Sequence, residues 1–416
     1  MFRYLVRRLL NRIERGGVIL RSAGQEWHFG DTEGDWVGTL EVKDSKFFEE
    51  VALRGEVGLG TSYVAGLWDS EDLETFLLVL NLNVNIFRST LRGLGPMFAG
   101  SRLMESISQR GLAHRKGSSV ENSRRGMSVA YDVGEDFFRM MLGESMLYSC
   151  ALYPDPEADL EAAQRHKLDV LIQKLDVAPG QRILDIGCGW GTLAEALSKR
   201  GCSVLGISLS RRQIEHCRRH VPGAKFEYLD YRHLEEEGTF DRVISVGMLE
   251  HVGCEFIPTY MESVARLLRP GGRAVLHTMV EGDQIQIGPG VHIRSFASTY
   301  VMPTSYIPSP VELTRAAYAT GTVWPTHVER FGQHYGRTMR QWRRNVLENR
   351  DEVCRRYSEE HVRTYDYLWA MSAACFTSGN FDLLQMVVVK EALGQDRAVQ
   401  DPRFAETDLD AMKHCA

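Results

Sequence analysis

The stretch Arg182-Ile183-Leu184-Asp185-Ile186-Gly187-Cys188-Gly189-Trp190-Gly191 decides the fold of this chain. Its apolar first half predicts a buried strand, and its glycines predict a tight turn that opens a helix over residues 192–199. Glycine supplies the φ values that such a turn needs and lets the backbone approach a ligand closely. The stretch therefore predicts a strand, turn and helix that together hold a ligand at the end of the strand.

Short apolar runs recur along the following part of the chain, each separated from the next by a helix-length segment. The runs lie at residues 182–187, 203–207, 225–228, 242–246 and 274–278. This alternation predicts an α/β fold, a doubly wound parallel sheet with helices on both faces. In such sheets the ligand binds at the carboxyl ends of the strands, where the strand order reverses.

Polar residues after these strands indicate which ligand is bound. Asp185 ends the first strand, where it can hold a cationic amino-acid group. A dinucleotide site usually has an acid after the second strand, but here Ser208, Ser210 and Gln213 follow it. Residues 229–232 (LDYR) follow the third strand and are placed to border an adenine. The pattern favours S-adenosylmethionine (SAM) as the cofactor. The expected cofactor residues are Asp185, Gly187, Gly189, Gly191, Ser208, Leu209, Gln213, Asp230, Tyr231, Arg232 and Val246.

Length and composition limit the classes of protein that remain. The 416 residues, 44% hydrophobic and 25% charged, are typical of a globular protein with two domains. A net charge of −6 argues against nucleic acid as a partner. Eight scattered cysteines without a C-x-x-C pair predict reduced thiols in a cytoplasmic protein and no metal site. No apolar run is long enough to span a membrane.

Shifts in composition predict four segments. They are a small α+β N-terminal domain at residues 1–87, a basic linker at 88–125, the catalytic domain at 126–392 and a polar tail at 393–416. In the first segment, alternation over residues 36–42 predicts a strand, and the apolar residues 73–82 predict a buried helix. We expect the first segment to serve lipid binding or dimerisation.

The first fifteen residues carry five arginines and apolar side chains at helical spacing. Arginines interrupt every apolar run, so the segment does not resemble a signal peptide. Two interpretations stay open for this segment: a helix that lies on an anionic membrane surface, or a terminal helix packed on the first domain. Basic linkers are usually solvated, and contact with lipid phosphates is the alternative interpretation of this one.

Several further stretches together resemble the cyclopropane fatty acid synthases and the related mycolic acid cyclopropane synthases. They are residues 131–134 (YDVG), 148–151 (YSCA), 247–253 (GMLEHVG), 276–278 (LHT), 331–335 (FGQHY), 340–343 (RQWR), 378–379 (SG) and 384–385 (LQ). The resemblance covers about residues 128–390, and residues 62–69 (SYVAGLWD) extend it weakly to the N-terminal domain of the bacterial synthases.

This resemblance implies a class I SAM-dependent methyltransferase fold and a lipid-modifying activity. The family transfers a methyl group from SAM to the cis double bond of an unsaturated acyl chain, in membrane phospholipid for the bacterial members. A bound bicarbonate ion then removes a proton, and a cyclopropane ring closes. The bicarbonate pocket of the family maps onto Cys150, Glu250, His277, Tyr335 and the backbone of Met279. The cofactor residues that the resemblance adds are Tyr131, Ser149 and His251. It also implies a homodimer that associates peripherally with the inner membrane surface.

The residue types suit this chemistry. SAM carries its own leaving group, so an alkene needs orientation in a dry site more than a strong base. His277, Tyr335 and Cys150 can donate hydrogen bonds to a small anion. Glu250 would repel bicarbonate unless it is protonated or orients the donors. Read alone, Cys150 is equally consistent with a packed core residue, and nothing beside it marks an activated nucleophile.

Departures from the family pattern leave the product open. They are Ala130, Glu135, residues 302–305 (MPTS), Ser372 and Thr377. The alternative is a fatty-acyl C-methyltransferase that forms a methyl or methylene branch from the same first step, or that methylates another unsaturated acyl chain. A SAM-binding or lipid-binding protein without catalysis, and a methyltransferase of small molecules or nucleic acid, are the other hypotheses.

Overall fold

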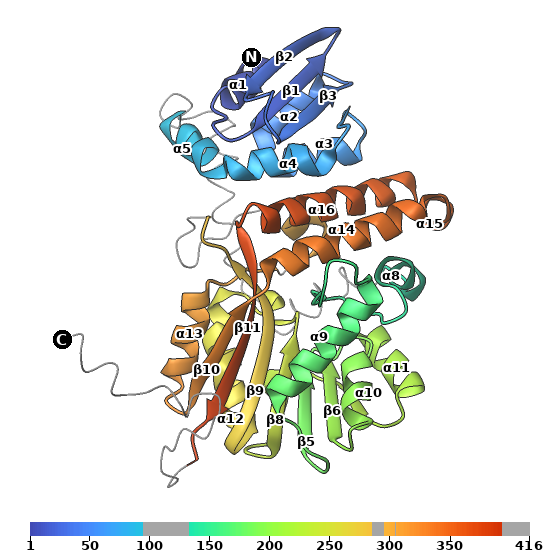
Figure 1. Ribbon diagram of the computed structural model, residues 1–416, viewed down its shortest axis with the longest axis vertical. Coiled ribbons are helices and arrows are strands. Elements are labelled where there is room, and N and C mark those ends of the chain that lie inside the picture. The colour runs from blue at the N-terminus through green and yellow to red at the C-terminus, as the bar shows by residue number, and fades with distance from the viewer. Residues whose placement is uncertain (95–132, 285–294, 304, 393–416) are drawn as a thin grey trace, which may run out of the picture.

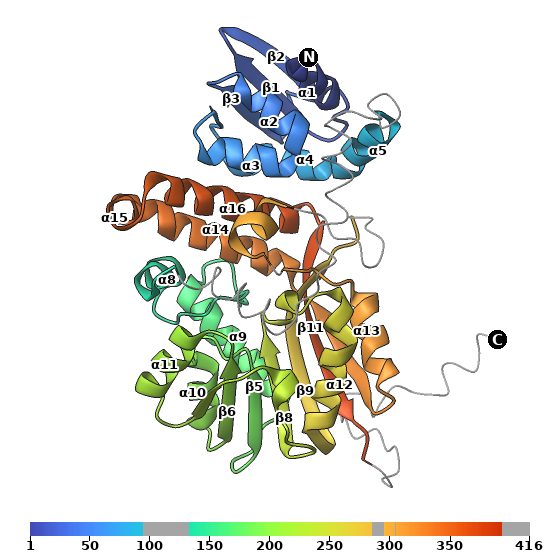
Figure 2. The same ribbon diagram turned by 180° about the vertical axis from the view of Figure 1, so that it is seen from behind.

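The computed structural model describes residues 1–94, 133–284, 295–303 and 305–392. Within these residues the chain forms a four-stranded sheet and a seven-stranded sheet. A layer of helices separates the two sheets (Figure 1), and further helices cover the back of the larger sheet (Figure 2). Tyr131, the tail at 393–416 and most of the predicted basic linker lie outside the described residues.

The smaller sheet belongs to the N-terminal part of the chain. Its strands are β1 (Gly17–Ser22), β2 (Gln25–Gly30), β3 (Val37–Val42) and β4 (Trp68–Asp69), in the order β2-β1-β3-β4. Its helices are α1 (Phe2–Leu10), α2 (Lys46–Arg54), α3 (Glu56–Val64), α4 (Leu73–Leu82) and α5 (Val84–Leu94). The predicted strand and buried helix of this segment are confirmed as β3 and α4. Because α5 runs through the expected boundary at residue 87, the division into domains stays a prediction.

The basic terminal segment forms α1 and packs on its own sheet. Val6 and Leu10 are buried in the core of the N-terminal part. The Arg3 guanidinium lies 5.1 Å from the ring centre of Phe48, and that of Arg7 lies 4.6 Å from Trp27. The structure therefore agrees with a terminal helix packed on the first domain, in which burial of apolar side chains anchors the segment.

The larger sheet contains all five strands predicted between residues 182 and 278. Its strands are β5 (Arg182–Ile186), β6 (Ser203–Ser208), β7 (Lys225–Tyr228), β8 (Phe240–Val246), β9 (Leu268–Glu281), β10 (Val323–Arg330) and β11 (Phe381–Lys390). They lie in the order β10-β11-β9-β8-β5-β6-β7. Neighbours among β5 to β9 pair in parallel, whereas β11 is antiparallel to both β9 and β10. The sheet is therefore mixed, because the chain returns to it through β11 after an excursion into helices.

The strand order reverses between β5 and β8. The chain first proceeds outward from β5 to β6 and β7, and then returns to place β8 and β9 on the other side of β5. Loops that leave β5 and β8 at their carboxyl ends diverge at this point, which opens the crevice where ligands of doubly wound sheets bind. The glycine-rich turn after β5 lies at this position, as the sequence predicts.

Helices flank the larger sheet and cover its carboxyl edge. They are α8 (Glu135–Leu142), α9 (Leu160–Leu175), α10 (Thr192–Ser198), α11 (Arg211–His220), α12 (Ile257–Leu267), α13 (Pro310–Ala319), α14 (Gly332–Glu348), α15 (Arg350–Arg356) and α16 (Glu359–Thr377). Short helical turns are η2 (Tyr231–His233), η3 (Leu249–His251), η4 (Cys254–Phe256) and η5 (Ala297–Val301). The pair α14 and α16 lies between the two sheets (Figure 1).

Polar contacts join the N-terminal part to this helix pair. The Tyr63 hydroxyl of α3 donates to Asp366 of α16 at 2.5 Å, and Arg343 of α14 donates to the same carboxylate at 2.7 Å. Arg340 of α14 donates to Glu74 of α4 at 2.6 Å. Because Asp366 is buried and both of its oxygens are bonded, it ties α3, α14 and α16 together.

Candidate active site

The acid at the end of β5 is buried and incompletely bonded. Asp185 is 2% exposed, and its Oδ2 atom has no hydrogen-bond partner among the described residues. Burial raises the pKa of Asp185 to about 7. A buried carboxylate without a partner is unfavourable, so this oxygen is suited to a donor supplied by a ligand.

The glycine-rich turn after β5 borders open space at one of its glycines. Gly187 and Gly189 have φ values of +84° and +54°, which side-chain-bearing residues rarely adopt. A Cβ atom on Gly187 would lie 2.8 Å from the Cγ atom of Met248, whereas one on Gly189 would meet nothing within 4 Å. Gly187 is therefore required by packing, and Gly189 faces a space that a ligand can occupy. Gly191, with a φ of +88°, precedes α10.

Buried hydroxyl and amide groups follow β6. Ser208 Oγ donates to Gln213 Oε1 at 2.9 Å. Ser210 caps α11, because its Oγ accepts from the backbone N–H of Gln213 at 3.3 Å. Leu209 is half-buried between the two serines. This end of β6 therefore presents neutral polar groups. A dinucleotide site would usually present an acid here, so the neutral groups agree with the prediction of a different nucleoside ligand.

The acid after β7 is paired within the chain. Arg232 donates to both oxygens of Asp230, at 2.8 Å from Nε and at 2.7 Å from Nη2. Burial acts to raise the pKa of Asp230, but the hydrogen bonds from Arg232 outweigh it and lower the pKa. The Tyr231 ring packs edge-on against Tyr260, with ring centres 5.2 Å apart. The Asp230–Arg232 pair is thus a fixed charged group at the edge of the sheet.

A strap formed by residues 145–153 crosses the carboxyl edge near β8. A Cβ atom on Gly247, which follows Val246 at the end of β8, would lie 3.5 Å from the Cβ atom of Ser149. The Gly247 N–H donates to the carbonyl of His277 at 2.8 Å, which joins the ends of β8 and β9. The strap therefore lies over the point where the strand order reverses.

Helix α9 holds the strap through two buried side chains. Gln164 donates to the carbonyl of Ser149 at 3.0 Å, and Lys167 donates to its Oγ atom at 2.8 Å. Lys167 is 0% exposed, and burial lowers its pKa to about 7. No described carboxylate forms an ion pair with it. The sequence reasoning missed Lys167, although its position on the apolar stripe of α9, with Ala163, Leu168 and Leu171, marks it as a buried cation.

Cys150 is fully buried in this strap. Its Sγ donates to the Ala151 carbonyl at 3.1 Å, and burial raises the pKa of the thiol well above its ordinary value. The Ala151 N–H donates to Thr338 of α14 at 3.1 Å, one turn from Tyr335. The thiol therefore stays protonated, which argues against a cysteine nucleophile. The hydrogen bond from Ala151 to Thr338 places Cys150 beside the helix that carries Tyr335.

Glu250, on η3 after β8, bonds to β9. Its Oε1 atom accepts from the Met279 backbone N–H at 2.6 Å, while Oε2 has no partner among the described residues. Burial raises the pKa of Glu250 to about 7, against the lowering effect of the Met279 bond. The Met279 amide, expected to help hold an anion, is thus engaged by Glu250, and a protonated Glu250 is itself a donor. The neighbouring His251 stays neutral, because burial lowers its pKa to about 4.

His277 on β9 is 1% exposed and bonded on one side only. Its Nδ1 atom lies 3.0 Å from Nε2 of Gln385 on β11, while its own Nε2 atom has no partner among the described residues. Burial, followed by the charges of Lys167 and Lys174, lowers the pKa of His277 well below its ordinary value. Gln385 was noted in the sequence only as part of a family motif. As the one polar residue in the apolar run Leu383–Val388, it could have been recognised as bonded in the core.

Aromatic side chains surround the strap on the side of α14 and α16. Tyr335 is buried, with its ring centre 4.9 Å from that of Phe376 and 5.9 Å from that of Trp342. Trp342 also contacts Tyr148 and Trp369, with ring centres at 5.3 Å and 5.1 Å. The groups expected at the anion pocket are therefore bordered by an apolar aromatic wall.

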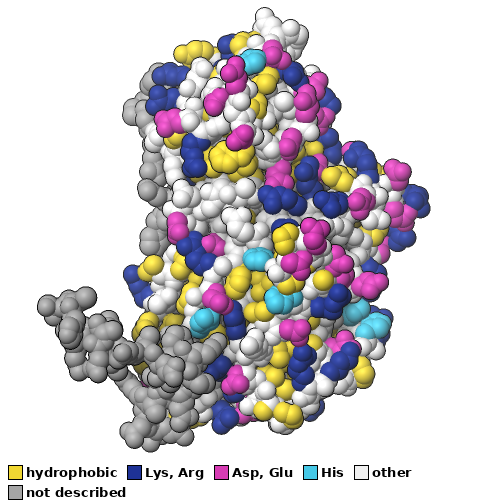
Figure 3. Space-filling view, in the orientation of Figure 1, with side chains coloured by type: hydrophobic (Ala, Val, Ile, Leu, Met, Phe, Trp, Pro, Cys, Tyr) yellow, Lys and Arg dark blue, Asp and Glu magenta, His cyan; other side chains and the backbone are white. Residues whose placement is uncertain are grey.

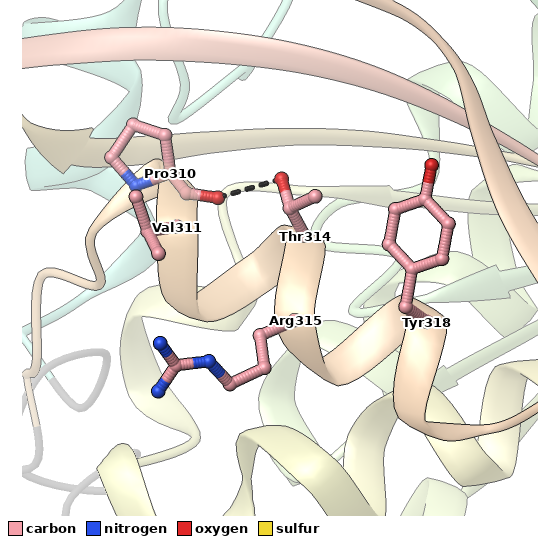
Figure 4. Close-up of a pocket in the computed structure, with 5 residues that line it drawn as sticks. All are labelled: Pro310, Val311, Thr314, Arg315 and Tyr318. Carbon is pink, nitrogen blue, oxygen red and sulfur yellow. Dashed lines mark hydrogen bonds between the residues drawn. The ribbon is translucent and has the colours of Figure 1, made fainter.

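Features outside this crevice do not resemble a second active site. Helix α13 carries a shallow surface pocket that none of the expected site residues lines (Figure 4). The pocket is lined by Pro310, Val311, Thr314, Arg315 and Tyr318.

Positive and negative side chains are interspersed over the face in Figure 3. The described residues include no cluster of three or more metal-binding side chains and no helix that is both long and apolar enough to cross a membrane.

The strand order, the glycine-rich turn and the acid at the carboxyl edge define this chain as an enzyme with the fold of SAM-dependent methyltransferases. Comparison with known proteins identifies the family. The family description "Mycolic acid cyclopropane synthetase" matches residues 118–386, and the chain belongs to this family. It is a SAM-dependent methyltransferase of the cyclopropane synthase family.

Relatives of two kinds match most of the chain. The cyclopropane-fatty-acyl-phospholipid synthase of Escherichia coli K12 is 32% identical over 361 residues, which cover 84% of this chain and 87% of the synthase. The tuberculostearic acid methyltransferase UfaA1 of Mycobacterium tuberculosis is 30% identical over 359 residues, which cover 82% of this chain and 80% of UfaA1.

A solved structure agrees with the fold of the larger part. The mycolic acid cyclopropane synthase CmaA1, complexed with SAH and CTAB, is 28% identical and superposes with a TM-score of 0.59. The superposition covers 64% of this chain and 98% of CmaA1.

Proposed function

We propose that this enzyme transfers a methyl group from SAM to the cis double bond of an unsaturated acyl chain in membrane phospholipid, and that the product is a cyclopropane. The observation that carries the proposal is the placement of Glu250 and His277 near the end of β8. Both are buried, and each has one polar atom without a partner among the described residues. His277 lies opposite Val246, the last residue of β8, and Glu250 accepts from the Met279 N–H, two residues further along β9. Two groups that can donate hydrogen bonds, in a crevice walled by aromatic rings, suit a small anion such as bicarbonate.

Different groups of the crevice suit the different parts of SAM. Asp185 Oδ2 is suited to the cationic amino group, and the open space at Gly189 to close approach of the amino-acid portion. Ser208 and Gln213 suit the ribose hydroxyls, and the segment at Asp230 suits the adenine edge. Bound SAM supplies the methyl group on a sulfonium centre. The other proposed contacts are Ser149, Leu209, Tyr231, Arg232, Val246, Gly187, Gly191, His251 and, outside the described residues, Tyr131.

The residues at the anion pocket act as donors. Glu250 is protonated in part of the molecules at neutral pH, because burial raises its pKa to about 7. In that form it donates to bicarbonate instead of repelling it. Tyr335 contributes a hydroxyl from α14, whereas the Cys150 thiol donates to the Ala151 carbonyl and lines the pocket without charge. These groups hold the anion next to the reacting carbons.

The reaction then needs only one base. Methyl transfer leaves a carbocation on the acyl chain, which the aromatic wall at Tyr335, Trp342 and Phe376 and the adjacent anion stabilise. A bicarbonate ion held by Glu250 and His277 would supply the base: it would accept a proton from the transferred methyl group, the C–H electron pair would form the second ring bond, and carbonic acid would result. His277 is a poor base here, because burial lowers its pKa well below the ordinary value.

A methyl-branched product is the second candidate. UfaA1, named as a tuberculostearic acid methyltransferase, covers nearly as much of this chain as the E. coli synthase does. The first step is common to both products, and the fate of the carbocation distinguishes them. Two atoms suited to a bound base, on Glu250 and His277, favour ring closure.

Access to the acyl chain requires contact with a lipid surface. We propose that the exposed basic face of α1 and the following residues, which carries Arg8, Arg12 and Arg15, docks on anionic headgroups at the inner membrane surface. Arg3 and Arg7 are held on aromatic rings and contribute less. A homodimer is a further expectation from the family, measurable by sedimentation.

The test uses the full chain with SAM and vesicles of cis-unsaturated phospholipid. We expect loss of alkene proton signals and the appearance of upfield cyclopropane methylene signals in the NMR spectrum of the extracted lipid. Turnover should fall in buffer freed of carbon dioxide and return when bicarbonate is added. Vinyl or branched-methyl signals would instead establish the second candidate. Turnover on a soluble substrate but not on vesicles would contradict the lipid assignment.

A further inference from the structure

Four polar side chains form a continuous row from the edge of the large sheet to the candidate anion pocket. Glu329, Gln385 and His277 are direct cross-strand partners on β10, β11 and β9. Lys174 of α9 donates to both Glu329 Oε2 and Gln385 Oε1, and Gln385 Nε2 lies 3.0 Å from His277 Nδ1. Exposure falls along the row, from a half-exposed Glu329 to a Gln385 that is 0% exposed.

The direction of each hydrogen bond in this row follows from Lys174. An ammonium group only donates, so the amide atom of Gln385 that faces it must be the oxygen. The amide nitrogen of Gln385 then faces His277, and an amide nitrogen also only donates. Nδ1 of His277 must therefore accept, and a neutral imidazole that accepts at Nδ1 carries its proton on Nε2.

The Lys174 side chain is itself held in place. Its ammonium forms the ion pair with Glu329 and lies 4.9 Å from the ring centre of Phe331. These contacts fix the amide of Gln385 in one of its two orientations. The fixed amide in turn removes the choice of tautomer from His277, whose Nε2–H then has no partner among the described residues.

We propose that Gln385, oriented by Lys174, is a positioning residue that fixes His277 as the Nε2–H tautomer, so that His277 donates a hydrogen bond to the bound anion and does not act as the base. The role of the anion rests on the proposed function. The tautomer is a property of the protein alone. In the opposite tautomer the Nε2 lone pair would face the anion and repel it.

Gln385→Glu tests this relation. The new carboxylate accepts hydrogen bonds only, so it would draw a proton onto Nδ1 of His277 and leave Nε2 without one, or charge the ring. The matched control is Gln173→Glu, the same change at an exposed position on α9 next to Lys174. Histidine labelled with ¹⁵N in the full chain reports the protonated nitrogen directly, and His277→Asn assigns the signal.

We expect the wild type and Q173E to show the Nε2–H pattern at His277, and Q385E to show the Nδ1–H or imidazolium pattern. If Q385E shows the Nδ1–H pattern, its turnover on vesicles should fall about 100-fold, as on loss of one donor to a reacting anion; an imidazolium keeps the Nε2–H donor, so that form should retain turnover. The Kd of Q385E for SAM should stay within about twofold of the wild type, because the cofactor residues are untouched. If Q385E does not fold, Lys174→Met is the substitute, and it should give a mixture of both tautomers.

A wild-type signal of the Nδ1–H form, or a Q385E signal unchanged from the wild type, would overturn the proposal. Normal turnover by a Q385E protein whose tautomer has switched would equally overturn it. A wild type with the Nε2–H signal but no activity on vesicles would leave the tautomer established and would contradict the proposed function instead.

Discussion

The Nζ atom of Lys167 donates to the Oγ atom of Ser149 at 2.8 Å, and this is the only hydrogen bond of a completely buried lysine among the described residues. Burying an ammonium group is unfavourable unless something compensates for it. The bond fixes the Ser149 hydroxyl, so that its own proton can be donated into the crevice. A buried amine whose one bond goes to Ser149, a proposed SAM contact, is better explained by function than by stability.

Lys167→Met removes this ammonium and keeps most of the apolar stem. We expect the free energy of unfolding to stay the same or to rise by about 1 kcal/mol, because a buried cation is lost. The Kd for SAM should rise about tenfold through loss of the orientation of Ser149. Titration calorimetry measures the Kd, with the exposed Lys199→Met as the control. An unchanged Kd would show that Lys167 serves only the core.

Asp185→Asn should change stability in a pH-dependent way. The folded protein keeps the Asp185 proton up to about pH 7, whereas an unfolded aspartate loses it near pH 4. The folded state therefore binds more protons in this range, and the contribution of Asp185 to stability falls as pH rises through about 7. Without SAM, D185N should be more stable than the wild type at pH 8 by about 1–3 kcal/mol.

Urea unfolding at pH 5 and pH 8 tests this expectation, since the difference between D185N and the wild type should shrink at the lower pH. The variant should also bind SAM at least about tenfold more weakly, through loss of a charge-assisted hydrogen bond. A stability difference that is the same at both pH values would contradict the assigned environment of Asp185.

Glu250 should make the use of bicarbonate depend on pH. Below about pH 7 the side chain is protonated and donates, and above it the carboxylate repels the anion. The bicarbonate concentration that gives half-maximal turnover should therefore rise between pH 7 and pH 8.5. In Glu250→Gln, which stays neutral, this concentration should be independent of pH. The exposed Glu255→Gln should behave as the wild type. A rise of equal size in E250Q would assign the effect to another group.

Gly189→Ala and Gly180→Ala separate backbone strain from loss of ligand space. Both glycines have positive φ, and a Cβ atom on either would meet nothing within 4 Å. Each substitution should therefore cost about 1 kcal/mol of stability. Only G189A should weaken SAM binding, because its methyl group enters the open space at the glycine-rich turn. Equal SAM affinities in the two variants would place the cofactor elsewhere.

The basic face at the N-terminus should control vesicle binding. Because α1 is packed into the core, deleting it would damage the fold, so substitution is the sharper test. The triple variant Arg8→Gln, Arg12→Gln, Arg15→Gln should bind anionic vesicles about 100-fold more weakly at low salt, from about 1 kcal/mol per arginine. Co-sedimentation measures this, with Arg165→Gln, Arg344→Gln as the control. Equal binding by both variants would exclude this face.

Much of the fold could be predicted from local patterns. The apolar runs became β5 to β9 because burial in a parallel sheet selects continuous apolar residues of strand length. The same reasoning did not detect β10, whose exposed and half-buried residues alternate at the sheet edge. It also left open whether the N-terminal arginines face lipid or protein, since helical spacing alone does not say what covers the apolar stripe.

The sequence by itself determined the strand, the glycine turn and the acid of the SAM crevice, because these act through backbone conformations set by neighbouring residues. Only the tertiary structure decided the chemistry around the anion pocket. Gln385 and His277 are separated by 108 residues, and their contact depends on the register of β11 against β9. The hydrogen bonds made in that contact carry the tautomer proposed for His277, and burial by the fold raises the pKa of Asp185 and Glu250.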